Sequence, residues 1–406
     1  MRVVVVGGGG REAVLAEVLG RTADVVVTPG NPGIPGSVTT APEHLDADLY
    51  VIGPEAPLVD GLADRLRAAG KAVFGPGTDG ARLEGSKAWM KDLVTAAGVP
   101  TARYGCFSDG PAAVEFLRSL PGPYVVKTDG LAAGKGVLVT SDLSVAEADV
   151  HAKLSGASFG AAGSSVVIEE AMVGPEVSVF AVCDGTRAVA LAPAQDFKRV
   201  GDGDTGPNTG GMGAYSPLPW LAEGFAADIV ARFIIPTLAE LRERSIDYRG
   251  VLYAGLMMTD EGPKLVEYNI RFGDPDSQVV LLRLTSDLAE LLAQAAAGAL
   301  HTAPTYSQDA AVLVVAAADG YPSAVRTGDV IEGLDAARAV DGASVHAAGV
   351  GTDDDGRLIT AGGRVLDVVG RGPDVRAARS VAYQALRCLS WPGMHHRTDI
   401  AAAAAS

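Results

Sequence analysis

Two oxygen-bearing side chains stand two residues apart in the segment Leu265-Val266-Glu267-Tyr268-Asn269. Residues two apart on a β-strand point to the same face, so Glu267 and Asn269 would present adjacent oxygens while Tyr268 turns away. Hard oxygen ligands in incomplete number leave places for water and phosphate, which is what Mg²⁺ on a nucleotide requires. Arg271 would share this face and could neutralise a carboxylate or a developing acyl phosphate. The alternative interpretation is a polar strand edge at the protein surface.

A glycine-rich loop follows Lys127 and reads Gly130-Leu131-Ala132-Ala133-Gly134-Lys135-Gly136. It is not a P-loop, because the spacing is one residue short and Gly136 stands where a magnesium-binding Ser or Thr should be. A strand rather than a helix follows it. Free backbone N–H groups and Lys135 could still close over a polyphosphate, with the Lys127 ammonium beside them. A solvated turn is the alternative.

The strand-like run Val166–Ile168 leads into two acids, Glu169 and Glu170. One interpretation is an exposed acidic turn. The other is an adenine-binding segment, in which backbone groups near Glu170 and Met172 contact the edge of the base and Glu176 accepts hydrogen bonds from the ribose hydroxyls.

The N-terminal loop Gly7–Gly10 follows an apolar strand and opens a helix, as a dinucleotide fingerprint does. Two residues argue against that function: Glu12 occupies the third fingerprint position, and Thr28 stands where an NAD site needs an acid. What remains is a backbone cradle at a helix N-terminus beside Arg11, which suits a monophosphate. A tight turn without a ligand is the alternative.

The elements that must position these residues change in character along the chain. In the first hundred residues, apolar strands alternate with helices, which predicts a doubly wound parallel sheet. In such sheets the ligand lies beyond the carboxyl ends of the strands, so the loop tips 7–10, 28–36 and 53–57 should converge on one crevice. The expected strands are 3–6, 25–27, 49–52 and 72–74, and the expected helices are 11–19 and 60–69.

Antiparallel character is expected after Pro100, with a strand–loop–strand unit at 124–140. Residues 195–217 hold many glycines and are predicted to form a long functional loop. The remaining expected elements are strands 166–170, 176–183, 251–258 and 264–268, helices 222–244, 277–298 and 374–388, and a strand-rich region at 310–375. The alanine-rich tail at 401–405 is expected to fray.

The predicted architecture is therefore mixed α/β and α+β with several domains. We assign an N-terminal Rossmann-like substrate domain to 1–98, a central domain with a mobile lid subdomain at about 122–185 to 99–302, and a C-terminal β-rich domain to 303–406. A chain of 406 residues is long enough for this number of domains.

A net charge of −16 argues against binding to a nucleic-acid backbone, although small anionic ligands remain compatible with it. Three well-separated cysteines form neither a disulfide framework nor a zinc cluster, and they suit a reducing cytosol. No signal peptide or membrane span is recognised, so a cytoplasmic protein without membrane or nucleic-acid partners is expected, and a monomer. The six histidines lie outside the loops above, which disfavours imidazole ligands or a His-based triad.

Seven motifs occur together in this order over nearly the whole chain. They are Gly-Gly-Arg-Glu (9–12), Pro-Gly-Asn (29–31), Gly-Pro-Glu-Ala-Pro-Leu (53–58), Leu-Glu-Gly-Ser-Lys (83–87), Asp-Gly-Leu-Ala-Ala-Gly-Lys-Gly (129–136), Gly-Pro-Asn-Thr-Gly-Gly-Met-Gly (206–213) and Arg-Phe-Gly-Asp-Pro (271–275). As a set they closely resemble the phosphoribosylamine–glycine ligase (glycinamide ribonucleotide synthetase) family of the ATP-grasp superfamily, which acts in purine biosynthesis.

The resemblance implies a central ATP-grasp domain that joins glycine to 5-phosphoribosylamine through glycyl phosphate, using ATP with Mg²⁺ or Mn²⁺. Charge neutralisation and positioning supply most of the rate in such phosphoryl transfer. It also implies site residues. Those expected at ATP are Lys87, Lys127, Gly134, Lys135, Gly136, Glu169, Glu170, Ala171, Met172 and Glu176. Those expected at the metal are Glu267 and Asn269, and the catalytic set is Arg271, Lys135 and Asp196. Those expected at glycine and phosphoribosylamine are Gly9, Gly10, Arg11, Glu12, Asn31, Pro54, Glu55, Thr209, Gly210, Gly211, Met212 and Asp274. The loops 129–136 and 195–213 would close as lids that exclude water.

Several positions depart from the family pattern. Gly8 replaces the usual Asn, Ala13 and Phe197 replace His, and the segment between Thr39 and Leu49 is shortened. These departures leave two other hypotheses open, an ATP-grasp ligase with a different acid or amine substrate and a nucleotide-binding paralogue without turnover. A nicotinamide oxidoreductase is the weakest candidate, because Thr28 lacks a carboxylate.

Overall fold

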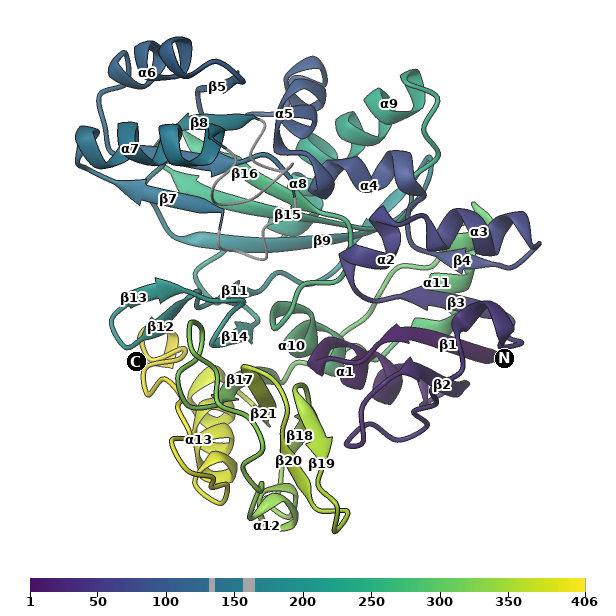
Figure 1. The fold of residues 1–406 in the computed structure, drawn as a ribbon. Coiled ribbons are helices and arrows are strands. Elements are labelled where there is room, and N and C mark those ends of the chain that lie inside the picture. The colour runs from purple at the N-terminus through teal and green to yellow at the C-terminus, as the bar shows by residue number, and fades with distance from the viewer. Residues whose placement is uncertain (131–135, 156–164, 406) are drawn as a thin grey trace.

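The N-terminal part of the chain forms the expected parallel sheet. A computed structural model describes residues 1–130, 136–155 and 165–405 (Figure 1). The strands are β1 (Arg2–Gly7), β2 (Asp24–Pro29), β3 (Leu49–Ile52) and β4 (Val73–Phe74), in the order β2-β1-β3-β4. Every pair is parallel. Val3–Val6 are buried, as is typical of a strand covered on both faces.

Helices of this part include the two that were expected, near 11–19 and 60–69. They are α1 (Gly10–Leu19), α2 (Glu55–Val59), α3 (Leu62–Ala68), α4 (Thr78–Gly85) and α5 (Lys87–Ala96), of which α4 and α5 were not predicted. The helix expected at 60–69 is shorter, and a separate helix α2 precedes it, because Gly61 has a φ of 78° and interrupts the helical backbone.

Two antiparallel sheets build the central part. One has the order β5-β8-β6-β7, from β5 (Tyr104–Phe107), β6 (Tyr124–Thr128), β7 (Val137–Thr140) and β8 (Val166–Glu170). It carries α6 (Gly110–Arg118) and α7 (Leu143–Leu154). The other has the order β10-β9-β15-β16, from β9 (Glu176–Asp184), β10 (Ala188–Ala190), β15 (Arg249–Thr259) and β16 (Gly262–Asn269). This confirms the antiparallel character expected there.

The prediction of a long loop at 195–217 is wrong, because most of these residues lie in strands. Its elements are β11 (Gln195–Asp196), β12 (Arg199–Gly201), β13 (Thr205–Asn208) and β14 (Gly213–Ser216). β12 and β13 pair as a hairpin, whereas β14 pairs with a strand one hundred residues away in the C-terminal sheet. That partner could not be read from the local pattern.

Two predicted helices are also more divided than expected. The helix expected at 222–244 consists of α8 (Phe225–Ile229), a π-helical turn η3 (Val230–Ile234) and α9 (Ile235–Glu243). The helix expected at 277–298 is α10 (Asp276–Arg283) and α11 (Leu288–Ala297), and Asp287 caps the second one by accepting from the Glu290 N–H. A new N-cap of this kind starts a new helix.

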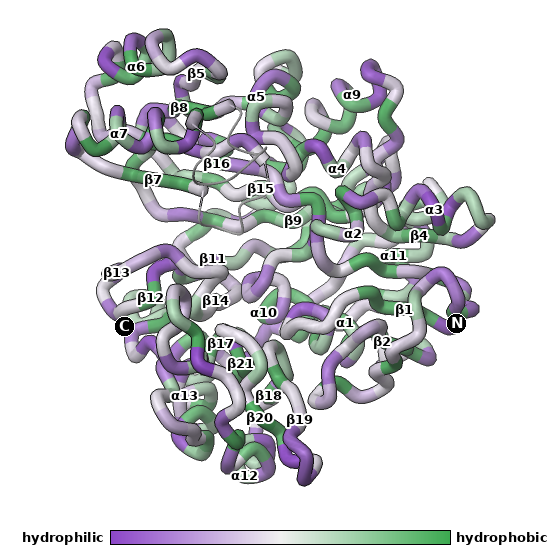
Figure 2. Tube along the Cα trace, in the orientation of Figure 1, coloured by the Kyte–Doolittle hydropathy of each residue, from purple (hydrophilic) through white to green (hydrophobic). Residues whose placement is uncertain are grey.

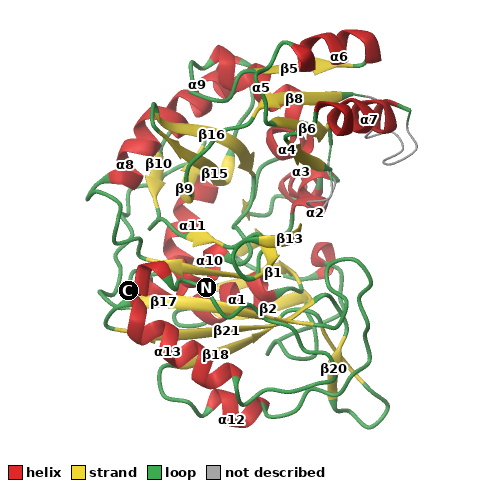
Figure 3. Ribbon diagram, turned by 90° about the vertical axis from the view of Figure 1, so that its left-hand side faces the viewer, coloured by secondary structure: helices red, strands yellow, loops and turns green. Residues whose placement is uncertain are grey.

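The C-terminal part is strand-rich, as predicted. Its main sheet has the order β11-β14-β17-β21-β18, and β19 pairs with β20 at its side. The bounds are β17 (Ala310–Ala317), β18 (Ala343–Ala347), β19 (Val350–Thr352), β20 (Leu358–Thr360), β21 (Arg364–Gly372), α12 (Leu334–Arg338) and α13 (Val375–Leu386). In Figure 3 this sheet lies at the opposite end of the molecule from α6 and α7.

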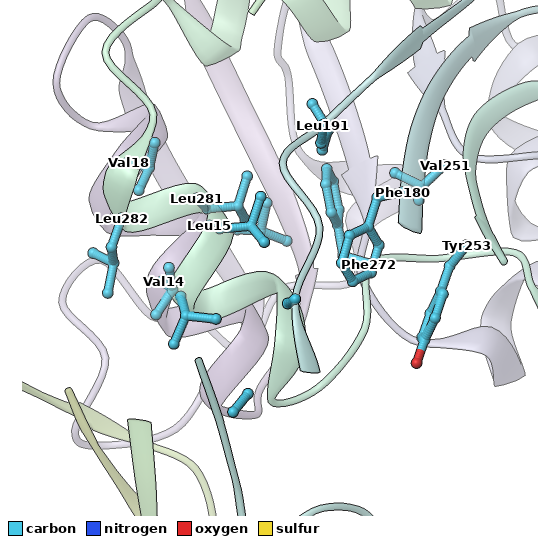
Figure 4. Close-up of a cluster of buried hydrophobic side chains, with 14 of the residues drawn as sticks. Val14, Leu15, Val18, Phe180, Leu191, Val251, Tyr253, Phe272, Leu281 and Leu282 are labelled. Atoms are coloured by element: carbon cyan, nitrogen blue, oxygen red, sulfur yellow. The ribbon is translucent and has the colours of Figure 1, made fainter. Parts of the chain in front are cut away.

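One large core joins the N-terminal, central and C-terminal parts, and a second, small core lies under α6 and α7. Figure 4 shows Val14, Leu15 and Val18 of α1 beside Leu281 and Leu282 of α10. In Figure 2 strand β9 is largely apolar, whereas α3 alternates hydrophilic and hydrophobic residues. Within the described ranges, no helix has the length and apolar character that crossing a membrane would require.

The C-terminal tail does not fray as expected. Ile400 and Ala401 are buried, and residues 403–405 form a 3₁₀ turn, η4 (Ala403–Ala405). Arg379 of α13 donates from Nε to the Ile400 carbonyl at 2.8 Å. Ile400 and Ala401 are therefore part of the C-terminal core, whereas Ala402 and Ala403 are exposed.

Replacing Ile400 with alanine tests this packing. We expect Ile400→Ala to lower the free energy of unfolding by about 2–5 kcal/mol, because it leaves a cavity in a close-packed interior. Urea denaturation followed by circular dichroism measures the change. The control is Val325→Ala at a position that is 38% exposed, where a change within about 0.5 kcal/mol is expected. A tail that contributes nothing would give the same small value for both variants.

Candidate active site

Strand β16 places the proposed metal ligands as the period of a strand predicts. The Tyr268 hydroxyl points away from the site, 2.8 Å from the Thr237 hydroxyl, and is buried. Asn269, on the opposite face, is only 7% exposed, and its Oδ1 accepts a hydrogen bond from Arg271 Nη2 at 3.1 Å. Glu267 lies on the same face and is partly exposed. Two oxygen-bearing side chains therefore do face one way.

Lys127 on β6 approaches β16 from the other sheet. Its Nζ lies 3.5 Å from the Val266 carbonyl and 3.0 Å from Glu169 Oε2. The other oxygen of Glu169 lies 3.2 Å from the Nζ of Lys91, a fully buried residue of α5. Lys127 thus lies between the two central sheets, where a bound triphosphate would meet β16.

The charges of this triad are unbalanced. Burial would raise the pKa of Glu169, but the ammonium groups of Lys127 and Lys91 hold it below its usual value. Burial lowers the pKa of Lys91 to about 8. Two ammonium groups share one carboxylate, so these three side chains alone carry one positive charge more than negative. Sequence reasoning missed Lys91, because only the fold brings it to Glu169.

A third ammonium group lies nearby at the start of α5. Lys87 donates to the Gly130 carbonyl at 2.9 Å. Burial lowers its pKa, and the nearby carboxylates of Glu267 and Asp129 oppose that shift. Gly134 and Lys135 lie outside the described residues. Gly136 is buried, and its carbonyl accepts from the Thr128 N–H at 2.8 Å, which closes the β6–β7 hairpin.

The proposed nucleoside segment follows β8. Glu170 Oε1 accepts from the Arg103 N–H at 2.9 Å, and the Ala171 N–H donates to the Pro123 carbonyl at 3.3 Å. Met172 follows and is partly exposed. These contacts fix the path of the backbone, and a role for Glu169–Met172 at the base stays a prediction.

Asp196 and Glu176 are joined by a lysine that sequence reasoning did not select. Lys198 Nζ lies 2.8 Å from Asp196 Oδ1 and 2.8 Å from Glu176 Oε2. Burial raises the pKa of Asp196 to about 7, against the opposing effect of Lys198. The loop behind them is ordered by Thr209, whose Oγ1 donates to the Lys198 carbonyl and accepts from the Gly211 N–H. Met212 is buried, and the Gly210 N–H donates to the Tyr321 hydroxyl.

Arg271 connects the central sheet to the N-terminal part. Its guanidinium lies 3.1 Å from Glu84 Oε1 and 3.4 Å from Glu55 Oε2, besides its bond to Asn269. Burial would lower the pKa of Arg271, but these two carboxylates raise it above its usual value. Burial also raises the pKa of Glu84, which sequence reasoning did not select. Pro54 caps α2, of which Glu55 is the first residue.

The loop tips of the parallel sheet converge as predicted on a crevice of about 470 Å³. Its lining residues are Val6, Gly7, Gly8, Pro29, Pro42, Glu43, Pro54, Pro57, Leu62 and Arg65. A Cβ on Gly8 would lie 2.4 Å from the Gly30 carbonyl oxygen, so this turn excludes the Asn usual in the family.

The polar residues at this loop are engaged with one another. Glu12 Oε2 accepts from the Gly9 N–H at 2.7 Å and its Oε1 lies 2.6 Å from Arg11 Nε, with both side chains nearly buried. The Asn31 amide donates to the Gly8 carbonyl at 2.9 Å and to the Ala348 carbonyl at 3.0 Å. Gly10 begins α1. These residues hold the tip against the C-terminal part, and their contacts with substrate stay predictions.

Asp274 lies at the same junction. Its Oδ2 is 2.9 Å from Arg364 Nη2 and its Oδ1 accepts from Gln278 Nε2 at 2.7 Å. Gln278 also donates to Asp367 Oδ2 at 3.1 Å. Burial and the charge of Asp274 raise the pKa of Asp367 to about 6.

The residues present fit a nucleotide-bound metal rather than a free-standing metal centre. Among the residues with described positions, no group of three or more His, Cys, Asp or Glu side chains could hold an ion. Glu267 and Asn269 alone would leave most positions of an octahedral ion to water and phosphate, which is how Mg²⁺ is held at phosphates.

Comparison with known proteins defines the class first. Models of the phosphoribosylglycinamide synthetase N domain, ATP-grasp (A) domain and C domain match residues 1–84, 85–277 and 311–403. The biotin carboxylase domain of a Hydrogenobacter thermophilus 2-oxoglutarate carboxylase shares the fold, with a TM-score of 0.73 at 15% identity, over 97% of this chain and 91% of that one. The chain is thus an ATP-grasp ligase with two flanking domains.

Closer relatives define the family. The phosphoribosylamine–glycine ligase of Streptomyces coelicolor is 48% identical over 100% of both chains, and that of Caulobacter vibrioides is 47% identical over 98% of this chain and 97% of its own. The crystal structure of the Thermotoga maritima enzyme superposes with a TM-score of 0.87 at 32% identity, over 98% of this chain and 100% of that one. The chain belongs to the phosphoribosylamine–glycine ligase family.

The Asp367 carboxylate gives a pH-dependent test of the junction. Its pKa is about 6 in the folded protein against 3.8 for an ordinary Asp, so the folded state favours the protonated form. The stability that this group contributes is present below about pH 4 and is lost as the pH rises through about 6. We expect Asp367→Asn to lack this decline, since its amide stays neutral. Urea denaturation of both proteins at pH 4.5 and pH 7 measures it, and parallel pH profiles would contradict the assignment.

Proposed function

We propose that the protein joins glycine to 5-phosphoribosylamine, forming glycinamide ribonucleotide, ADP and phosphate, as in purine biosynthesis. The observation that carries this proposal is the meeting of Lys127 and Lys87 with the Glu267–Asn269 face of β16. Lys127 lies against the Val266 carbonyl, and Lys87, which donates to the Gly130 carbonyl, is close enough to Glu267 for that carboxylate to act on its pKa. The family relationship supplies the two substrates.

The reaction would proceed in two displacements. A glycine carboxylate oxygen attacks the γ-phosphorus of ATP, the bond from that phosphorus to the β-bridging oxygen breaks, and ADP leaves with its electron pair. The amine nitrogen of phosphoribosylamine then attacks the carbonyl carbon of glycyl phosphate, phosphate leaves, and the nitrogen loses a proton. An acyl phosphate intermediate makes the carbonyl carbon reactive enough for amide formation.

The side chains divide this work by charge. Lys87 and Lys127 would hold phosphate oxygens, with Lys135 as a further ammonium group from the glycine-rich loop. Glu267 and Asn269 would hold Mg²⁺ or Mn²⁺, which when bound neutralises the charge of the phosphates. Arg271 would face the acyl phosphate, and Asp196 with the loop Thr209–Met212 would hold the glycine. Gly9–Glu12, Asn31 and Pro54–Glu55 would bind the phosphoribosyl end of the amine.

The direct test is turnover of purified protein with ATP, Mg²⁺, glycine and freshly prepared phosphoribosylamine. ADP release that requires both glycine and the amine is expected. Release that responds to another amino acid instead would assign a different acid substrate. ATP binding without ADP release under every mixture would leave a nucleotide-binding protein.

The metal assignment is tested by Glu267→Gln. We expect kcat to fall at least about a hundredfold, because a metal ion supplies several kcal/mol of charge stabilisation in such transfers. The matched control is Glu261→Gln on the exposed β15–β16 turn, where the carboxylate pairs only with Lys264 at 2.7 Å. Retention of full activity in Glu267→Gln at saturating Mg²⁺ would refute the assignment, as would turnover that persists in excess EDTA.

The role of Lys127 is tested by Lys127→Met. We expect KM for ATP to rise about tenfold or more, since a hydrogen bond to a charged group contributes about 1.5–3 kcal/mol. Lys71→Met removes an ammonium group at the surface, where it pairs with Asp46 at 2.9 Å, and should leave KM unchanged. Equal KM values for both variants would show that Lys127 does not contact the phosphates.

A further inference from the structure

The C-terminal segment His395–Asp399 (the C-terminal strap) lies along the β12–β13 hairpin, almost two hundred residues earlier in the chain. His395 Nε2 lies 2.8 Å from the Val200 carbonyl, and the Thr398 N–H donates to Asp202 Oδ1 at 2.8 Å. The Gly203 N–H donates to Asp399 Oδ2 at 2.8 Å. The strap therefore contacts β12 and the turn between β12 and β13.

Arg397 is the centre of this contact. It is 1% exposed and is the bulkiest of the fully buried side chains in the described residues. Nε and Nη2 donate to the two oxygens of Asp399, each at 2.7 Å, in the bidentate geometry that suits guanidinium. Nη1 donates to Asp204 Oδ1 at 2.7 Å and to the Arg199 carbonyl at 3.2 Å.

The guanidinium also stacks on a residue of the active-site loop. Arg397 lies 5.0 Å from the ring centroid of Phe197, a distance at which a cation is attracted by an aromatic face. Phe197 stands between Asp196 and Lys198, and its carbonyl accepts from the Met212 N–H at 2.7 Å. Arg397 thus contacts Phe197, whose chain neighbours are Asp196 and Lys198. Lys198 pairs with both Asp196 and Glu176.

The strap itself is anchored to firm elements of the C-terminal domain. His395 and Ala317 exchange two backbone hydrogen bonds at the end of β17. The Tyr383 hydroxyl of α13 donates to the Arg397 carbonyl at 2.9 Å and accepts from the Ile400 N–H at 3.2 Å. A chain of contacts therefore runs from β17 and α13 through the strap to Phe197 and the loop before Met212.

We propose that Arg397 is a positioning residue of the ligase, which holds the 196–212 loop in the geometry that binds glycine. This inference rests on the proposed function, because that function assigns Asp196 and Thr209–Met212 to the glycine. Hydrogen-bonded Arg397 also lowers the pKa of Asp399 to about 2, so the pair stays ionised at neutral pH. Stacking on Phe197 makes use of an aromatic ring at a position where the family usually has His.

The test compares steady-state kinetics of Arg397→Gln, Arg397→Lys and Asp204→Asn with those of the unaltered chain. We expect Arg397→Gln to raise KM for glycine about tenfold, because small misplacements of binding groups are costly, while KM for ATP stays within twofold. Arg397→Lys keeps the positive charge but cannot make the bidentate guanidinium contact. Its KM for glycine should lie between those of the unaltered chain and Arg397→Gln. Asp204→Asn, at a side chain that is 68% exposed, removes the charge of one partner of Arg397 but keeps an oxygen acceptor, and should give a smaller change in the same direction.

The matched control is Arg357→Gln. Arg357 also bridges two aspartates, Asp353 and Asp355, but on an exposed turn between β19 and β20. Its variant should leave KM for glycine unchanged. Unchanged KM for glycine in both Arg397→Gln and Asp204→Asn would overturn the proposal, as would equal rises in KM for glycine and ATP.

Hydrogen exchange gives a readout that does not depend on turnover. Faster exchange of the amides of residues 197–212 is expected in Asp204→Asn and, if it folds, in Arg397→Gln, with no change in β9 and β15. Unaltered exchange in this loop would overturn the proposal even if Arg397→Gln fails to fold. If the unaltered protein shows no glycine-dependent turnover, the proposed function fails, whereas the exchange result still decides whether Arg397 holds the loop.

Discussion

The Arg271 guanidinium is shared among Glu55, Glu84 and Asn269, and the arrangement of the site depends on that sharing. The three partners come from the start of α2, from α4 and from β16, so this side chain links helices of the N-terminal part to the ATP-grasp sheet. Because these groups are largely withdrawn from water, removal of one would leave an uncompensated charge. The same arginine that would meet a substrate oxyanion therefore also links the two parts, in addition to the hydrophobic core that they share.

The opposite sheet uses charge differently. Lys127 and Lys91 share Glu169, and Lys87 adds an ammonium group in a chain whose net charge is −16. These ammonium groups are close together and largely buried, so they could hold a polyphosphate without making the whole surface basic. Arg271 thus links the domains on one side of the site. The lysines that would hold the nucleotide lie on the other side.

Short-range patterns predicted the features that depend on strand period and chain order. The alternation in the first hundred residues predicted the parallel sheet, and the two-residue spacing predicted the shared face of Glu267 and Asn269. Features that depend on distant partners were missed. Lys91 and Lys198 belong to none of the seven motifs, and Glu84 lies in one without a role assigned to it; only the fold brings them to Glu169, Asp196 and Arg271. The glycine content of 195–217 indicated a loop, because strands as short as β11–β14 leave little periodicity.

The pairing of β14 with β17 bears on how the chain could be divided. β11 and β14 leave the central region and complete a sheet whose other strands begin at Ala310. A fragment starting near residue 303 would lack two of its five strands and would leave the edge of β17 unpaired, which is a template for aggregation. Autonomous folding of the last hundred residues is therefore disfavoured. The three regions recognised by family comparison are not structurally independent, because strands from the central region complete the C-terminal sheet.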